Sequence, residues 1–224
     1  MNTLIRRIML AGWIAAELRG QAGLKIMGRD VTVITPKTDA DGFFPEGPAA
    51  VCVEGPPRRQ CYTAPKEFGR YPSAEVVVLR KNAPAIFFSA NSVGVSGYNI
   101  HFALLKLGQG PTLENLLPSG LSASNKSAHA FLFDPQISDT QIFVKADAVY
   151  GPGETAPDAH RYRVSAYVWR TRYLAEDAVY WLEDQYTTAR AYKYFPEGEP
   201  EILAIEKAEI LDRLKRAKVA RPLQ

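Results

Sequence analysis

The sequence predicts a mainly β protein, an antiparallel β-sandwich or barrel-like sheet followed by one C-terminal amphipathic helix. Three observations support this fold class. Short β-branched and aromatic runs recur at spacings of roughly 8 to 12 residues. Glycine and proline separate most of these runs, as is typical of turns. Helical periodicity is clear only near the C-terminus, so the helix is expected to cover one sheet face or one open end.

The first strands are expected between residues 31 and 62. The run "VTVIT" (31–35) is β-branched, and "VCV" and "QCY" around Cys52 and Cys61 each have the character of a short strand. The segment 38–48 is rich in turn residues and predicts a linker.

The middle of the chain predicts several apolar strands. Residues 74–91 form two nearly continuous apolar runs joined by a Lys-Asn-Ala-Pro turn, so both are expected to be central strands covered on two faces. A strand is expected over 98–108, and 113–118 fits either a short helix or an edge strand. The small, polar segment 117–127 predicts a loop. Residues 128–135 and 140–153 are again expected to be strands.

Apolar and polar residues alternate most regularly in the last third of the chain. In "HRYRVSAYVWR" (160–170), Tyr162, Val164, Ala166 and Val168 are expected on one face and the intervening residues on the other. A long tyrosine-rich strand, or a broken pair, is predicted over 178–195, with "TRYLAED" between them as a hairpin loop.

A helix is predicted over 199–218. Pro200 suits its first position, and its acidic start and basic end complement the helix dipole. Its apolar stripe predicts packing against the β-rich body, and residues 31–224 are therefore interpreted as a single β-rich domain with this helix.

Residues 1–30 have the order of a secretory signal. Arg6 and Arg7 precede the apolar run 8–16, and Gly20-Gln21-Ala22 offers a small-x-small cleavage site. Glu17 and Arg19 do not suit a cleavage region, so a retained N-terminal helix that packs on the body or on a partner is the alternative. The apolar run is shorter than the roughly 20 residues that span a bilayer. Export to the periplasm or the extracellular space is predicted, with membrane association through this segment if it is retained.

The two cysteines, in "CVEGPPRRQC" (52–61), allow three interpretations. A zinc site needs four ligands, and the three histidines lie far downstream. A redox pair needs a Cys-x-x-Cys spacing, which is absent. A disulfide between Cys52 and Cys61 across a short hairpin fits best, and it predicts an oxidising compartment. Two free buried thiols in a cytoplasmic protein remain the alternative.

Charge is concentrated at the N-terminus. Residues 1–30 hold five basic and two acidic side chains, which leaves 22 of each sign over residues 31–224. A neutral body lacks the excess of positive charge that neutralises phosphates, so a nucleic acid partner is not expected.

Four segments, "CVEGPPRRQCYTAPKEFG", "IFFSANSVGVSGYNIHFALL", "ISDTQIFV" and "HRYRVSAYV", resemble segments of uncharacterised exported proteins from environmental bacteria. The resemblance covers residues 50–218. It implies export and brings no activity and no catalytic residues with it.

Catalytic motifs are weak throughout. There is no phosphate loop and no dinucleotide fingerprint. The segment around Ser96 departs from a nucleophile elbow because its second glycine falls one place early, at Gly97. Asp39 and Asp41 are spaced as in a calcium loop, but the distal ligands do not follow, so an Asp-Gly turn is preferred.

The histidines and the paired carboxylates are the remaining candidates for a metal or catalytic site. His101, His129 and His160 each sit in or beside an apolar strand and are interpreted as structural rather than as a shared metal site. In Glu176-Asp177 and Glu183-Asp184 the neighbours should point to opposite faces of a strand, so neither dipeptide forms a catalytic pair by itself. The first is interpreted as a hairpin tip, and the second is expected to place one acid against an arginine such as Arg163 or Arg190.

The aromatic residues between Tyr162 and Tyr194 remain as the candidate binding surface. Tyr167 and Trp169, with Arg163 on the same face and Trp181 on the next strand, are predicted to bind a ligand or partner. The alternative is that these aromatics only stabilise the sheet through cross-strand pairs.

The sequence therefore predicts an exported, non-catalytic binding or structural protein, acting as an envelope component or as a subunit of a larger assembly. Its partner is expected to be a protein or a surface glycan, and no metal or cofactor is expected. The first alternative is a secreted hydrolase that acts on polysaccharide or peptide with Glu183 or Asp184 as an acid. The second alternative is a subunit of a membrane-associated complex whose N-terminal helix is uncut.

Overall fold

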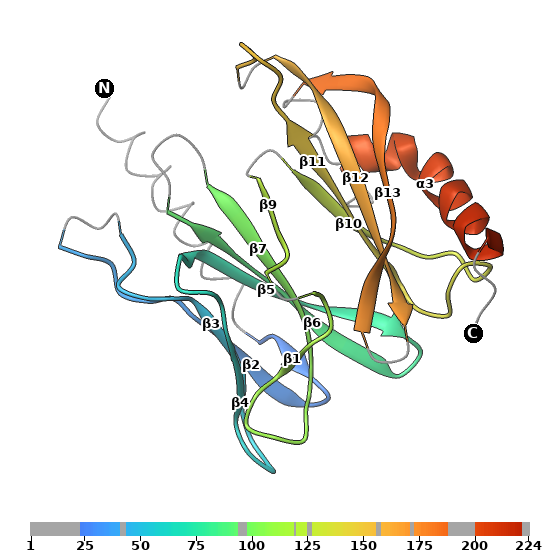
Figure 1. Ribbon diagram of the computed structural model, residues 1–224. Coiled ribbons are helices and arrows are strands. Elements are labelled where there is room, and N and C mark those ends of the chain that lie inside the picture. The colour runs from blue at the N-terminus through green and yellow to red at the C-terminus, as the bar shows by residue number, and fades with distance from the viewer. Residues whose placement is uncertain are drawn as a thin grey trace, which may run out of the picture.

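Figure 1 shows the computed structural model of the chain, which describes residues 23–40, 44–93, 98–118, 120–124, 127–155, 158–170, 173–187 and 200–220. The prediction for the signal-like segment falls mainly on residues 1–22, which lie outside the described residues. The fold class is confirmed: antiparallel sheets are stacked in a sandwich-like arrangement, and one helix is described at the C-terminal end.

The described strands form three sheets. The N-terminal sheet has the order β1 (Lys25–Ile26), β2 (Arg29–Ile34), β3 (Ala50–Val53) and β4 (Gln60–Thr63). The middle sheet has the order β5 (Phe68–Arg80), β6 (Ala83–Ser92), β7 (Asn99–Lys106) and β8 (Glu114–Asn115), and β9 (Ser122–Ser124) also pairs with β7. The C-terminal sheet has the order β10 (Ala128–Leu132), β11 (Ile142–Val149), β12 (Ala159–Arg170) and β13 (Tyr173–Thr187), and α3 (Glu201–Ala220) covers its outer face.

The middle sheet is buried on both faces because its strands are apolar at successive positions. On β6, Ile86 and Phe88 enter a core shared with the N-terminal sheet, whereas Ala85 and Phe87 enter a second core shared with the C-terminal sheet. Phe87, Phe143 from β11 and other rings pack together in that second core. Complete burial of such a side chain stabilises the fold by about 1.5 to 3 kcal/mol.

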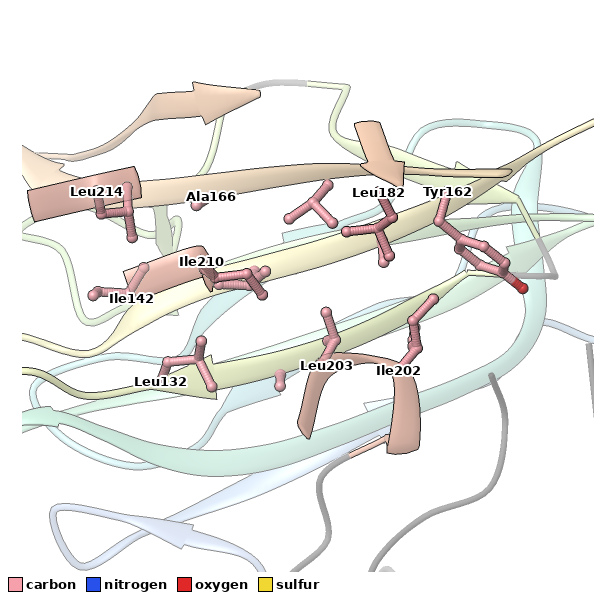
Figure 2. Close-up of a cluster of buried hydrophobic side chains, with 14 of the residues drawn as sticks. Leu132, Ile142, Tyr162, Ala166, Leu182, Ile202, Leu203, Ile210 and Leu214 are labelled. Carbon is pink, nitrogen blue, oxygen red and sulfur yellow. The ribbon is translucent and has the colours of Figure 1, made fainter. Parts of the chain in front are cut away.

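A third core lies between the C-terminal sheet and α3. The predicted alternation on β12 is confirmed, because Tyr162, Val164, Ala166 and Val168 all enter this core. Figure 2 shows Tyr162 and Leu182 from the sheet and residues of α3 directed into the same interior. The helix contributes buried side chains spaced along one stripe, namely Ile202, Leu203, Ile210 and Leu214.

Three local expectations are wrong. The first apolar run of 74–91 lies in β5, which is an edge strand, although Val76 and Val77 still contact the cores on opposite faces. The expected loop over 117–127 contains the short strand β9. The expected hairpin loop over 171–177 is mostly strand, because β13 begins at Tyr173 and the buried Leu174 packs between the middle and C-terminal sheets.

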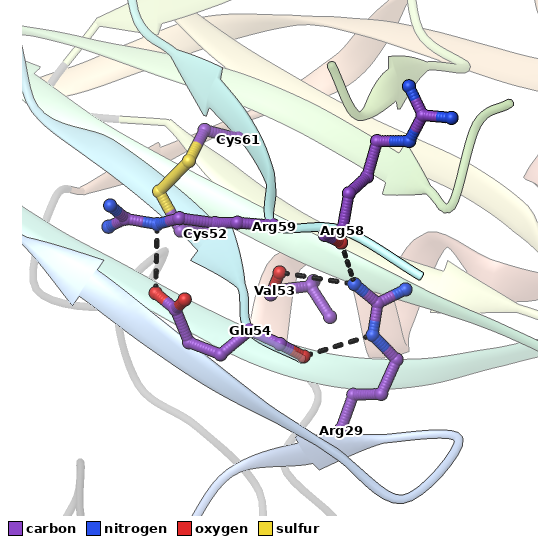
Figure 3. The surroundings of a disulfide bond; sticks show 7 residues. All are labelled: Arg29, Cys52, Val53, Glu54, Arg58, Arg59 and Cys61. Atoms are coloured by element: carbon purple, nitrogen blue, oxygen red, sulfur yellow. Dashed lines mark hydrogen bonds and ion pairs between the residues drawn. A yellow bond between two sulfur atoms is a disulfide. The ribbon is translucent and has the colours of Figure 1, made fainter. Parts of the chain in front are cut away.

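The disulfide is confirmed. Cys52 on β3 and Cys61 on β4 are direct partners in the antiparallel ladder and are bonded, with Cα atoms 4.1 Å apart. Figure 3 shows this bond beside the turn that joins the two strands. The cross-strand geometry expected from the spacing is therefore the one that the chain adopts.

Arg29 holds the same turn from the neighbouring strand β2. Its guanidinium donates hydrogen bonds to the carbonyl oxygens of Val53, Glu54, Gly55 and Arg58, at 2.6 to 3.3 Å. Part of this network is drawn in Figure 3. One side chain thus satisfies four carbonyls at the end of β3 and in the turn that follows it.

Candidate functional site

The four predicted binding residues divide into two groups. Tyr167 is buried between the middle and C-terminal sheets, and its hydroxyl donates to Glu176 Oε1 at 3.2 Å. Trp169 is half-buried against the same core. These two aromatics pack between two sheets, where the alternative interpretation expected cross-strand aromatic pairs within one sheet, and Tyr167 is not available at the surface.

Arg163 and Trp181 remain exposed and lie directly opposite each other in the β12–β13 ladder. The side chain of Trp181 is 45% exposed, and the guanidinium of Arg161 lies over its ring at 5.1 Å from the centroid. The structure therefore brings together only this part of the predicted surface.

A bulge in β13 follows directly after Trp181. Arg163 pairs with Trp181 and Arg161 pairs with Gln185, so three residues of β13 (Leu182, Glu183 and Asp184) lie opposite the single residue Tyr162. β13 thus accommodates two extra residues here, and the ladder is locally disrupted.

A groove of about 310 Å³ lies between this bulge and α3. The strand side consists of five consecutive residues, Tyr180 to Asp184, and the helix side of Glu206, Glu209 and Arg213. The helix residues are three and four positions apart, so they lie along one face. Glu183 and Asp184 are neighbours in this run, and both belong to the lining of the groove. On either side of Asp184, Leu182 and Tyr186 are buried whereas Glu183 and Gln185 are exposed, as an alternating strand predicts.

The acidic side chains of the groove differ in how they are bonded. Glu209 accepts a hydrogen bond from Arg213 Nε at 2.5 Å, and Glu206 accepts one from the Tyr186 hydroxyl at 2.6 Å. Glu183 and Asp184 form no hydrogen bond or ion pair with any other described residue. The expected ion pair with Arg163 is not formed, and Arg190 lies outside the described residues.

Tyrosine hydroxyls near the groove are buried. The Tyr180 hydroxyl has no hydrogen-bond partner, and burial, followed by the nearby charge of Glu206, raises its pKa. The guanidinium of Arg213 lies over the Tyr180 ring at 4.2 Å from the centroid. The Tyr162 hydroxyl is likewise buried without a partner, and burial raises its pKa to about 12. Both tyrosines are therefore neutral at physiological pH.

The three histidines have different neighbours. His101 Nε2 lies 2.8 Å from the Tyr62 hydroxyl in the core of the N-terminal and middle sheets. His129 lies among Phe87 and Phe102, and burial lowers its pKa to about 4. His160 Nδ1 lies 3.0 Å from Glu154 Oε2, and its Nε2 is buried without a partner. Within the described part of the chain, no three or more metal-ligating side chains are arranged to hold a metal ion.

A second, smaller cavity of about 140 Å³ lies beside Trp169. Its lining combines apolar residues such as Leu79 and Leu116 with the cations Arg80 and Lys106. Arg80 and Lys106 already pair with Asp139 and Glu114, at 3.6 and 3.2 Å. Both cations that line this cavity are therefore already paired with acidic residues.

Two motifs considered from the sequence lie partly outside the described residues. The segment around Ser96 falls within 94–97, and Asp41 falls within 41–43. Asp39 accepts a hydrogen bond from the amide of Phe44 at 3.1 Å, as expected of a turn.

Sequence reasoning missed the helix side of the groove. Glu206, Glu209 and Arg213 repeat along one helix face, which is visible in the sequence, but nothing in the sequence shows that this face lies beside β13. No family model, no curated protein and no solved structure matches the chain. No helix among the described residues has the length and apolar character needed to cross a membrane.

Proposed function

We propose that this chain is an exported, non-catalytic binding protein that acts as an envelope component or as a subunit of a larger assembly. The disulfide between Cys52 and Cys61 supports export, because persistent disulfides belong to oxidising compartments. The signal-like order of residues 1–30 supports it independently.

The observation that carries the binding role is the exposure of Trp181 at the groove. A tryptophan offers a large contact area, and this one on β13 is close to half exposed, although the large aromatics of the neighbouring strand β12 are buried or half-buried. Exposed Trp side chains beside arginines are typical of the residues that dominate protein interfaces. Val179 on the same strand is 42% exposed and extends the apolar surface.

The test is recovery of the protein from its native source after selective release of the periplasm. Wild-type chain, Trp181→Ala and Phe133→Ala are expressed at equal levels and isolated with what they bind. Phe133 is a matched control, since it is 55% exposed and lies outside the groove. We expect Trp181→Ala alone to lose the bound component. Recovery of the protein from the cytoplasm with an intact N-terminus would contradict export. Recovery of equal amounts of the bound component with all three chains would contradict the binding role of Trp181.

A second candidate function is a secreted hydrolase that acts on polysaccharide or peptide. One observation favours it: Glu183 and Asp184 both line one groove, and neither has a partner among the described residues. The check is release of soluble sugars or peptides from cell-wall polysaccharide and casein by wild-type protein and by Glu183→Gln. Product release that is lost in Glu183→Gln would favour the hydrolase over the binding role.

A further inference from the structure

The cavity beside Trp169 lies where the middle sheet meets the C-terminal sheet. Segments far apart in the chain line it: Leu79 and Ala83 from the β5–β6 hairpin, Leu116 after β8, Thr140 before β11, and Trp169 on β12. A concave site at the junction of two packed layers is a common position for a small-molecule site.

Backbone hydrogen bonds hold the walls of this cavity in place. The amide of Gln141 donates to the carbonyl oxygen of Leu79 at 2.7 Å, and the amide of Leu174 donates to that of Leu116 at 2.7 Å. Each bond joins the middle sheet to a segment of the C-terminal sheet at a residue that lines the cavity. A site that is formed before binding loses little conformational entropy when a ligand enters.

The size and the apolar lining of the cavity indicate what can enter it. Its volume is about 140 Å³, and an apolar cavity of about 150 Å³ is known to bind benzene. Leu79 and Leu116 are only 5% and 1% exposed, and the half-buried Trp169 adds an aromatic wall. The cavity therefore suits one aromatic ring or one short branched chain, and it is too small for a large cofactor.

The charged residues that line the cavity are both cations. Arg80 and Lys106 belong to the lining, whereas their acidic partners Asp139 and Glu114 do not. The side chains of Arg80 and Lys106 are 51% and 36% exposed, so these cations lie nearer to solvent than the buried leucines do. The local charge of the lining therefore favours an anionic group over a cationic one.

Both cations keep donors that no described residue uses. Arg80 Nη1 is 3.6 Å from Asp139 Oδ2, which is too long for a hydrogen bond, and Lys106 Nζ is 3.2 Å from Glu114 Oε2. Neither cation has a further hydrogen bond or ion pair with a described residue. A guanidinium has five N–H donors and an ammonium has three, so an additional acceptor can be bound without breaking either pair.

We propose that this cavity binds a small monocarboxylate. Its ring or short branched chain lies between Trp169 and the buried leucines, and its carboxylate accepts hydrogen bonds from Arg80 and Lys106 near solvent. Charge-assisted bonds of this kind are stronger than neutral ones. The inference goes beyond the proposed function, because Trp181 is not part of this cavity and the two sites are tested by different variants.

The test is an NMR titration of the full chain with sodium benzoate, read at the indole N–H signals of Trp169 and Trp181. Benzyl alcohol and benzylammonium present the same ring with a neutral and a cationic group. Arg80→Gln/Lys106→Gln removes the two cations of the cavity. The matched control is Lys25→Gln/Arg59→Gln, because these side chains are 56% and 53% exposed and each also pairs with one acid. Ala83→Leu is designed to fill the cavity.

We expect benzoate to shift the Trp169 signal and to leave the Trp181 signal unchanged. Its affinity should fall about tenfold in Arg80→Gln/Lys106→Gln and stay within about twofold of wild type in the control variant. Benzyl alcohol should bind more weakly than benzoate to wild type and equally to wild type and to the cavity-charge variant. Ala83→Leu should abolish the shift of Trp169 by both ligands.

Three results would overturn the proposal. Absence of a shift at Trp169, an equal shift at Trp181, or an unchanged shift in Ala83→Leu would show that the ring does not enter this cavity. Equal weakening in the two charge variants would show general charge attraction. Equal affinity for benzyl alcohol or for benzylammonium would overturn the choice of a carboxylate.

Discussion

The hairpin of β3 and β4 and the hairpin of β12 and β13 are built in opposite ways. The first has an unbroken register from Ala50↔Thr63 to Val53↔Gln60 and is closed by the disulfide. The second loses its register twice, between Arg161 and Arg163 and between Ala166 and Tyr167. A covalent bond and the Arg29 guanidinium fix the turn of the first hairpin, whereas packing on α3 and the hydrogen bond from Tyr186 to Glu206 hold the region of the bulge in the second.

The two hairpins also differ in what their polar side chains bond: those of the first bond the protein itself, whereas some of the second have no partner among the described residues. Around the β3–β4 turn, Arg29 bonds four carbonyls and Arg59 pairs with Glu54 at 3.0 Å. At the β13 bulge, Glu183 and Asp184 line a groove without bonding any other described residue. Exposed side chains that gain no internal partner are the ones that a partner molecule can engage.

Removing a packing residue under the bulge should have the largest effect on stability. Leu182 is 2% exposed and contacts the core between the C-terminal sheet and α3. Leu182→Ala should lower the free energy of unfolding by about 2 to 5 kcal/mol because it leaves a cavity. Urea denaturation followed by circular dichroism measures this. Val179→Ala on the same strand, at a 42% exposed position, is the control and should change little. A small loss for Leu182→Ala would mean that the bulge is not held by packing.

Removal of the disulfide should have the next largest effect. Cys52 and Cys61 are nine positions apart, so the bond closes a short loop. Cys52→Ser/Cys61→Ser should lower the free energy of unfolding by about 2 to 3 kcal/mol in the chain-entropy description. Wild-type protein treated with a reductant should have the same free energy of unfolding as the variant. Two titratable thiols in denatured, unreduced native protein would show that the bond is absent and would remove most of the support for export.

Loss of the Arg29 side chain should have a moderate effect. Its guanidinium bonds four carbonyl oxygens of the β3–β4 turn, and hydrogen bonds from charged donors contribute about 1.5 to 3 kcal/mol where they are shielded from water. Because this network is partly exposed, Arg29→Ala should cost about 1 to 3 kcal/mol in denaturant unfolding. Arg59→Ala breaks only an exposed pair with Glu54 and should cost less than about 1 kcal/mol. Equal losses for the two variants would show that Arg29 acts as an ordinary surface charge.

Local sequence patterns were sufficient to predict the β3–β4 hairpin and the buried face of β12. The spacing of Cys52 and Cys61, with a turn between two short strands, predicts a direct cross-strand pair, and the bond is formed. The alternation that begins at Tyr162 predicts a buried face, and the helix covers it. Both predictions depend on residues close together in the chain.

The groove depends on information that is not local. Its lining joins five consecutive residues of β13, which include the residues opposite Tyr162, to three residues of α3. Tyr167 and Trp181 belong to the same aromatic segment in the sequence, yet one is covered by the middle sheet and the other is not. Which sheet covers which face, and where a ladder slips, are set by packing between distant strands.

Neutralising the unpartnered acids should have the smallest effect on stability, and its sign distinguishes the two regions. Glu183→Gln/Asp184→Asn should leave the free energy of unfolding within about 0.5 kcal/mol of wild type, or raise it slightly, because like charges in the groove no longer repel. Asp30→Asn/Asp139→Asn breaks two ion pairs, with Lys25 and Arg80, and should lower it by up to about 1 kcal/mol. Thermal unfolding at low and high salt measures both, and the difference between the variants should shrink in about 1 M salt because exposed charges are then screened. A clear loss of stability in the groove variant would mean that Glu183 and Asp184 serve the fold, as Arg29 does, and are not held available for a partner.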